Sequence, residues 1–333
     1  FDRQFDCCYF ISKYENQKFM NNNNTIQKAI IKVIAFFDLF DYPLTEYEIW
    51  KYLDKKCELQ DVTNELKKFN NLMQKRYDFY FFKNRECIVD KRINRRGVTK
   101  KKIKKALWVC KIFKFIPWIK MVAIGNIIGT YNLNEQSDID LFIITKNNKI
   151  WTTRFFCVGL LTILGIRPKE NNKKDKLCPS FFITEGAMDL SQLMLYNNSE
   201  DILTNNIDIY FIYWLTGLVV IYDVDKTYEK FIGSNSWIKQ YLPNWQGGEK
   251  TEETGAGHLS AEADRCPVPV SSVGKLEKCF KKIQLKIMPR QLKEMANKNT
   301  KVVINDKILK LHVNDRRDKY RKAFLNNLKA YFA

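Results

Sequence analysis

The sequence contains only two histidines, His258 and His312, in 333 residues. This scarcity argues against a metal site built on imidazole ligands and against a histidine-activated nucleophile. The nine cysteines include no CxxC pair, and most of them lie in apolar runs, where cysteine serves as a small core residue. Neither a disulfide framework nor a zinc site is therefore predicted, and a reducing cytoplasm is the expected location.

A hydrophobic run long enough to cross a bilayer is also missing. The most hydrophobic segment, residues 207–222, contains Asp208 and is shorter than the ~20 residues that a spanning helix needs. We expect a buried helix there, with an interfacial helix as the alternative. The first residues show neither the basic nor the apolar segment of a secretory signal. No membrane span is expected.

Acidic residues are in the minority, and the formal net charge is +19. A basic surface favours polyanionic partners, because binding releases counterions, so weak nucleic-acid contact is one expectation. The alternative is that a base-composition bias in the coding DNA produces the many lysines. A hydrophobic content of 45% and an aromatic content of 14% are typical of a folded globular chain of two or three domains.

Two aspartates separated by one residue begin an apolar segment, Ser137-Asp138-Ile139-Asp140 followed by residues 141–144. Side chains alternate between the faces of a strand, so Asp138 and Asp140 are predicted to share one face. Such neighbouring carboxylates repel each other unless a cation lies between them. Mg²⁺ suits hard oxygen ligands and completes its shell with water and substrate phosphates, so a Mg²⁺ site is expected, with Mn²⁺ as an alternative. A surface strand with two solvated acids is the simpler interpretation.

An apolar run at residues 121–124 predicts a preceding strand, and Gly125-Asn126 predicts the turn that ends it. Strand, glycine turn, spacer and Asp-x-Asp strand together resemble the polymerase-β-type nucleotidyltransferase superfamily. The chain also resembles a group of bacterial nucleotidyltransferase-domain proteins of undefined substrate, in the strings at residues 38–45, 143–146, 174–178 and 237–245.

The resemblance implies roles for individual residues. Asp138 and Asp140 would be catalytic and would hold the metal, while the nucleotide would bind at Gly125, Asn126, Gly129 and Ser137. Asn126 departs from the pattern, since Ser or Gly usually stands there. Ser137 could equally cap its own turn.

A third carboxylate usually comes from a later strand in this superfamily. The strand predicted here at residues 177–183 contains no acid, and Cys178 and Ser180 occupy the positions where one is expected. The nearest acids flank that strand, and the candidates for a third carboxylate are therefore Asp175, Glu185 and Asp189. Each of them is also a typical loop or cap residue.

The region before the acidic strand predicts three short helices and a hairpin. A helix is expected from Thr25 to about Tyr42, a second after the capping box at Thr45, and a third at residues 61–74. Strands are expected at residues 77–82 and 86–91. This order resembles a winged-helix domain, which binds DNA in some proteins and docks on proteins in others.

The expected fold class is α+β, with a small mixed β-sheet core, flanking helices and a winged-helix-like domain before it. The densest basic run, Lys91 to Lys105, is predicted to be either a solvated helix face or a surface that attracts a polyanionic substrate. The expected divisions are a tail at 1–24, a winged-helix-like domain at 25–97, a nucleotidyltransferase-like core at 98–190, a helical substrate-side region at 191–246, a flexible insertion at 247–274 and a C-terminal helical region at 275–333.

The resemblance implies a Mg²⁺-dependent enzyme that transfers a nucleoside monophosphate from a nucleoside triphosphate such as ATP to a hydroxyl acceptor, with release of pyrophosphate. The acceptor is not identified by the sequence. The alternative is a non-catalytic regulator that binds DNA or protein and carries a degenerate nucleotidyltransferase domain. Asn126 and the acid-free strand at residues 177–183 favour that alternative.

Overall fold

The computed structural model describes residues 25–69, 72–126, 128–195, 207–247 and 273–332. The expected N-terminal tail at 1–24 lies outside the described residues, and so does most of the expected insertion at 247–274. His258 also falls outside them.

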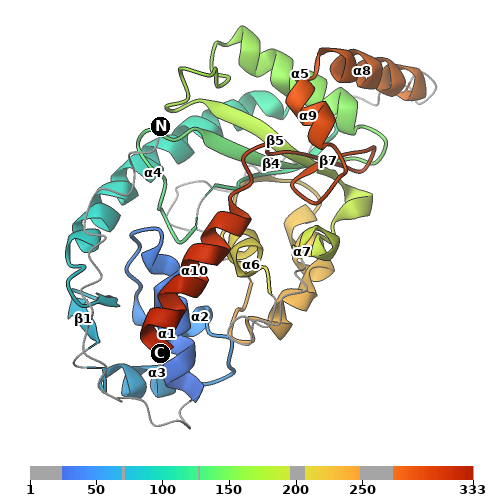
Figure 1. Cartoon of the computed structure of the whole chain (residues 1–333). Helices are drawn as coiled ribbons and strands as arrows, with labels where there is room; N and C mark the ends of the chain where they lie inside the picture. The colour runs from blue at the N-terminus through green and yellow to red at the C-terminus, as the bar shows by residue number, and fades with distance from the viewer. Residues whose placement is uncertain (1–24, 70–71, 127, 196–206, 248–272, 333) are drawn as a thin grey trace.

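A six-stranded open sheet lies in the upper half of the molecule in Figure 1. Its strand order is β6-β3-β4-β5-β8-β7, in which β4 and β5 run parallel and the other neighbours run antiparallel. The chain is therefore α+β with a mixed sheet, as predicted. The strands are β3 (Ile119–Ile124), β4 (Ile139–Thr145), β5 (Leu177–Thr184), β6 (Val219–Asp223), β7 (Val302–Ile304) and β8 (Ile308–Leu311).

Helices cover both faces of this sheet. On β4, Phe142 and Ile144 belong to one buried cluster, whereas Leu141 and Ile143 belong to the cluster on the opposite face. Burial on both faces explains why the central strands are almost continuously apolar. The first face is covered by α6 (Ile209–Thr216) and α7 (Thr227–Ser234), and the second by α4 (Cys87–Phe113), α5 (Ile150–Ile163), α8 (Val273–Ile287) and α9 (Arg290–Met295). Helix α1 (Thr25–Asp38) packs against α6 in the first cluster.

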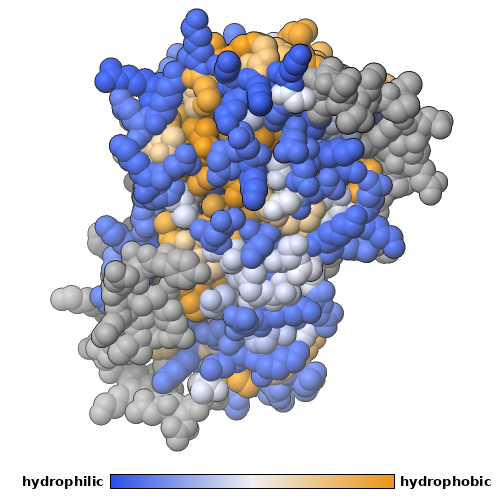
Figure 2. Space-filling view, turned by 90° about the vertical axis from the view of Figure 1, so that its right-hand side faces the viewer, coloured by the Kyte–Doolittle hydropathy of each residue, from blue (hydrophilic) through white to orange (hydrophobic). Residues whose placement is uncertain are grey.

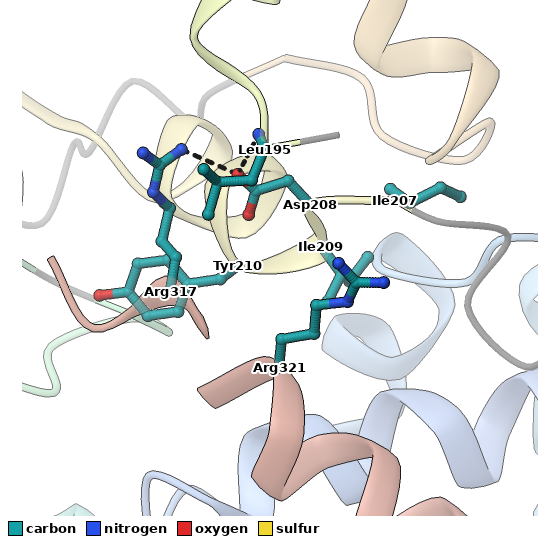
Figure 3. A pocket seen from close by; sticks show the side chains of 7 residues that line it. All are labelled: Leu195, Ile207, Asp208, Ile209, Tyr210, Arg317 and Arg321. Atoms are coloured by element: carbon teal, nitrogen blue, oxygen red, sulfur yellow. Dashed lines mark hydrogen bonds and ion pairs between the residues drawn. The ribbon is translucent and has the colours of Figure 1, made fainter. Parts of the chain in front are cut away.

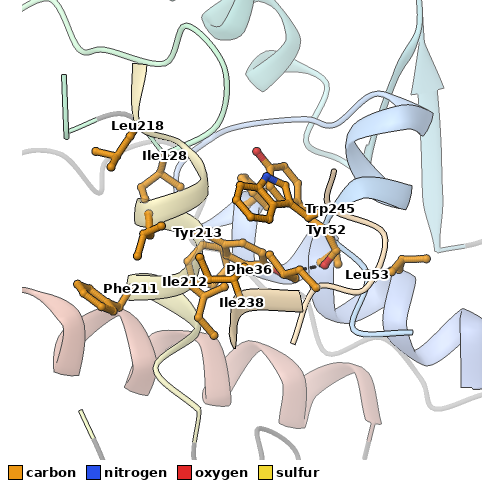
Figure 4. Close-up of a cluster of buried hydrophobic side chains, with 14 of the residues drawn as sticks. Phe36, Tyr52, Leu53, Ile128, Phe211, Ile212, Tyr213, Leu218, Ile238 and Trp245 are labelled. Carbon is orange, nitrogen blue, oxygen red and sulfur yellow. Dashed lines mark hydrogen bonds between the residues drawn. The ribbon is translucent and has the colours of Figure 1, made fainter. Parts of the chain in front are cut away.

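The first cluster joins the N-terminal helices to the region that follows the acidic strand. The rings of Phe36 and Phe37 on α1 lie 4.7 and 5.1 Å from the ring of Tyr213 on α6. Figure 4 shows Phe36, Tyr52 and Tyr213 packed together with Trp245. A single core therefore connects segments that are far apart in the sequence.

Three short helices and a hairpin form the N-terminal region, in the order that was predicted. They are α1, α2 (Glu46–Lys51), α3 (Leu59–Leu66), β1 (Met73–Arg76) and β2 (Phe79–Phe82). The capping box at Thr45 and Glu48 is present. The predicted hairpin register is wrong, because the chain turns at Tyr77, which has a φ of 56°, and not at residues 83–85. The third helix is also shorter than predicted.

Residues 86–91 were predicted to be a strand but belong to the start of the 27-residue helix α4. Ile88 and Val89 are buried beside Phe81 of β2, and this contact needs both residues on one side of a helix. The basic run continues in the same helix, which passes without interruption through the boundary expected between residues 97 and 98.

Residues 207–222 were predicted to be one helix, and this prediction is wrong. Helix α6 ends at Gly217, and residues 219–223 form the edge strand β6, which pairs with β3. The β-branched residues Val219, Val220 and Ile221 suit a strand, and glycine is a common stop signal for a helix. The region expected to be helical at 191–246 thus also contributes to the sheet.

The C-terminal region was expected to be helical, but it also supplies β7 and β8 before the final helix α10 (Arg317–Phe332). Helix α10 crosses the middle of the molecule in Figure 1 and reaches α1, where Phe324 lies 5.6 Å from Phe36 between ring centroids. Arg317, at its start, donates a 2.8 Å hydrogen bond to Asp208, and both side chains are 4% exposed. Figure 3 shows this pair beside a small pocket between α6 and α10.

The surface seen in Figure 2 is mostly hydrophilic, and its hydrophobic atoms gather in the upper half between hydrophilic side chains. Among the described residues, no helix combines the length and the apolar character that crossing a membrane requires.

Candidate metal and nucleotide site

The glycine turn and the acidic strand meet at one end of β3 and β4. The antiparallel pairing brings Ile124 opposite Leu141, and the next residue, Gly125, donates a 2.9 Å backbone hydrogen bond to the carbonyl of Asp140. A Cβ at Gly125 would lie 3.4 Å from the indole of Trp214 on α6. The turn is therefore held directly against the acidic strand, with little room for a side chain.

Three side chains converge beside this turn. The ligand atoms of Asp138, Asp140 and Cys178 all lie within 4.8 Å of one another, and all three residues are half-buried. Asp140 and Cys178 are register partners on the parallel strands β4 and β5. Among the described residues, this is the one group of three or more histidines, cysteines or acids whose ligand atoms are close enough to hold a metal ion together.

A bulge in β5 shapes the side of the site opposite β4. Leu141 pairs with Pro179 and Phe142 pairs with Phe181, so Ser180 is an extra residue without a partner on β4. A bulge tolerates proline inside a sheet and redirects the neighbouring side chains. Hydrogen bonds from Cys178 and Ser180 reach the carboxylate of Asp140.

A histidine contacts Ser180 from the end of the neighbouring strand β8. Nε2 of His312, just after β8, is 3.1 Å from the hydroxyl oxygen of Ser180. A hydrogen bond therefore links the ring of His312 to the hydroxyl group that also contacts Asp140. Burial, reinforced by Lys310, lowers the pKa of His312 to about 4, so its ring is neutral at pH 7.

The charged forms of Asp138 and Asp140 are disfavoured when no cation is bound. Burial raises the pKa of Asp140 to about 7, and the neighbouring Asp138 adds to the shift. Burial also raises the pKa of Asp138, although Lys173 and Lys102 oppose this. In the described part of the chain, neither carboxylate forms an ion pair. A bound cation would relieve both the burial and the mutual repulsion.

The residues expected to contact nucleotide have different surroundings. Nδ2 of Asn126 donates a 2.9 Å hydrogen bond to the carbonyl of Asp138, while its Oδ1 is buried without a hydrogen-bond partner among the described residues. The hydroxyl of Ser137 donates to the carbonyl of Asn134 at 2.9 Å, which matches the turn-capping interpretation. Asn126 therefore lies against the acidic strand, and Ser137 stabilises the approach to it.

Gly129 is accounted for by packing. Its φ is +82°, and a Cβ there would lie 2.7 Å from two ring carbons of Tyr42. The hydroxyl of Tyr42 in turn accepts a 2.8 Å hydrogen bond from the amide of Thr130. The glycine thus lets the loop after β3 pack against the N-terminal helices.

The three candidates for a third carboxylate do not join the group. Asp175 forms a 2.9 Å ion pair with Lys102, and Asp189 accepts a 2.9 Å hydrogen bond from the amide of Ser191. Glu185 begins the short 3-10 helix Glu185–Ala187. The strand position that faces Asp140 is occupied by Cys178.

The basic run divides into two parts. Lys101 and Lys104 are exposed, as both interpretations of the run require, whereas Lys102 is buried. Its ammonium group donates to the carbonyl of Ser137, the residue before Asp138. Helix α4 therefore supports the start of the acidic strand with one lysine and presents the others to solvent.

Some neighbours of the site could not be found in the sequence. Cys178 and Ser180 were noticed only as residues that replace an expected acid, and His312 was not associated with the site. Lys102 was part of the basic run that one interpretation placed beside the site, but its contact with Ser137 was not predicted. Ser180 and His312 are 132 residues apart, so no local pattern connects them. The short apolar segment at Ile308 and Leu309 was the sole signal that a strand precedes His312.

Comparison of the chain with protein-family models, with curated proteins and with solved structures gives no match in any of the three.

Proposed function

We propose that the chain is a divalent-cation-dependent nucleotidyltransferase that transfers a nucleoside monophosphate from a nucleoside triphosphate to a hydroxyl acceptor, with release of pyrophosphate. The observation that supports this most strongly is the convergence of Asp138 and Asp140 beside the turn at Gly125. A buried carboxylate pair without a cationic partner is unfavourable by itself and becomes favourable with a cation and phosphates.

The donor set of the two aspartates fits Mg²⁺, because carboxylate oxygens are hard ligands. The unpartnered Oδ1 of Asn126 is a further oxygen in the adjoining turn. When bound, the cation would neutralise phosphate charge and orient the reacting groups. The thiol of Cys178 is not a ligand that Mg²⁺ prefers.

The remaining residues would position the substrate. Gly125 would hold the turn close to the acidic strand, because a side chain there would meet the indole of Trp214. Lys102 fixes the carbonyl of Ser137 and so the entry to the acidic strand. The exposed Lys101 and Lys104 add positive potential that attracts a polyanion.

Replacement of both aspartates tests the proposal. We expect Asp138→Asn together with Asp140→Asn to abolish cation-dependent release of pyrophosphate from labelled nucleoside triphosphates, with Mg²⁺ and Mn²⁺ assayed separately. Glu185→Gln is the matched control, because this acid lies outside the cation-binding group, and it should keep full turnover. Unchanged turnover in the double variant, with its circular dichroism spectrum intact, would refute the proposal.

The absence of a third carboxylate from the group formed by the described residues favours a second candidate, a non-catalytic regulator that uses the same residues as a nucleotide sensor. Its nucleic-acid-binding form has less support, because α3, the helix that would read DNA, contains Asp61 and Glu65 but no lysine or arginine. Binding of a nucleoside triphosphate without turnover by the unaltered chain would favour the sensor over the enzyme.

A further inference from the structure

Cys178 stands where a hard ligand would complete the acidic pair. Its sulfur and the two carboxylates lie within 4.8 Å of one another, and its backbone is the register partner of Asp140 in the middle of the sheet. Strand positions hold ligands more precisely than loops do. The thiol is therefore fixed at the site by the same backbone pairing that fixes the carboxylate.

Among the described residues, no third acid joins Asp138 and Asp140 at this position. The nearest acid before β5, Asp175, is held by the ammonium group of Lys102, whose side chain is 1% exposed. The buried Oδ1 of Asn126 lacks a hydrogen-bond partner among the described residues, and its amide group is anchored on the carbonyl of Asp138. An unsatisfied oxygen in the turn that adjoins two unpaired carboxylates is a second feature that a bound cation would explain.

We propose, building on the function proposed above, that Cys178 is the third protein ligand and that the site prefers a thiophilic divalent cation of the Zn²⁺ and Co²⁺ class over Mg²⁺. Thiolate ligands select such cations, whereas carboxylates alone suit Mg²⁺. The thiol proton now directed at Asp140 is displaced to solvent on coordination, because a metal-bound thiol is deprotonated.

Titration of the full chain with Co²⁺ tests this ligand directly. We expect a near-ultraviolet sulfur-to-cobalt charge-transfer band in the unaltered chain and in Cys279→Ser, a control at an exposed cysteine of α8. Cys178→Ser should lose the band. It should also lower the Co²⁺ affinity by at least roughly 10- to 100-fold, which is the loss expected when a residue that only supports a metal ligand is replaced. Cys178→Asp should instead strengthen Mg²⁺ binding.

The competing results separate this inference from the proposed function. Persistence of the band in Cys178→Ser, or equal Co²⁺ affinity in that variant and the unaltered chain, would remove Cys178 as a ligand while the aspartate variants still test the enzyme. Failure of the unaltered chain to bind any divalent cation would overturn both proposals. If Cys178→Ser does not fold, X-ray absorption of the cobalt-loaded unaltered chain decides, because a first shell without sulfur contradicts the assignment.

Discussion

Lys102 and Asp175 form an ion pair in which Nζ lies 2.9 Å from Oδ1, with the lysine side chain 1% exposed and the aspartate side chain 42% exposed. The buried lysine therefore depends on the ion pair more than the partly exposed aspartate does. Its charge has been removed from water and is satisfied by Asp175 and the carbonyl of Ser137. The pair therefore stabilises the loop that leads into β5, beside the two aspartates of the site.

Asp175→Asn should lower the free energy of unfolding by about 1 to 3 kcal/mol, the range for a lost hydrogen bond to a charged group. Lys102→Met combined with Asp175→Asn should cost less than the sum of the two single changes, because neither charge is then left alone. Urea denaturation measures both effects. Cation affinity should stay unchanged in Asp175→Asn, and a large loss there would make Asp175 a ligand after all.

His312 should make the chain sensitive to mild acid. Its pKa is lowered from 6.5 to about 4 by burial and by Lys310, so the unfolded chain takes up a proton near pH 6.5 that the folded chain accepts only near pH 4. The contribution of neutral His312 to the free energy of unfolding is complete above pH 6.5. It falls by up to roughly 3 kcal/mol as the pH drops from 6.5 to about 4.

The variant His312→Gln isolates this effect, since its side chain does not titrate. We expect the difference in unfolding free energy between the unaltered chain and the variant to shrink as the pH falls from 7 to 4.5, measured by denaturant unfolding at each pH. Asp140, whose raised pKa acts in the opposite direction, is present in both proteins. Parallel stability curves would show that His312 is not held neutral.

The two glycines Gly129 and Gly159 should respond oppositely to alanine. Gly129→Ala places a Cβ 2.7 Å from the ring of Tyr42 at a φ of +82°, so we expect a loss of roughly 1 to 3 kcal/mol of stability. At Gly159, within α5, a Cβ would meet no neighbouring atom within 4 Å, and alanine there should add up to about 1 kcal/mol. Chemical denaturation of both variants is the measurement, and a neutral effect at Gly129 would contradict the packing role.

Local patterns were sufficient to predict the elements that carry the acids. The apolar run before Gly125 and the alternation around Asp138 and Asp140 have the period of buried strands, and β3 and β4 lie where this period places them. The capping box at Thr45 is equally local. The strand period also predicted that the carboxylates of Asp138 and Asp140 lie close together, and they do, although β4 itself begins at Ile139.

The rest depends on contacts between distant segments. The position of Cys178 opposite Asp140 depends on the strand register and on a bulge at Ser180, which no spacing in the sequence reveals. Residues 207–222 form one apolar run, and such a run does not distinguish a buried helix from a buried strand. The break at Gly217 was the available signal that α6 gives way to β6.

The late position of β8 in the sequence affects how the protein is made. β5 has β8 as its neighbour on one side, and α10 then packs on α1 near the other end of the chain. During synthesis, the hydrogen-bonding groups on this edge of β5 stay unpaired until residues 308–311 have left the ribosome. For that interval the nascent chain carries an open strand edge, which is the kind of surface that chaperones protect and that aggregation exploits.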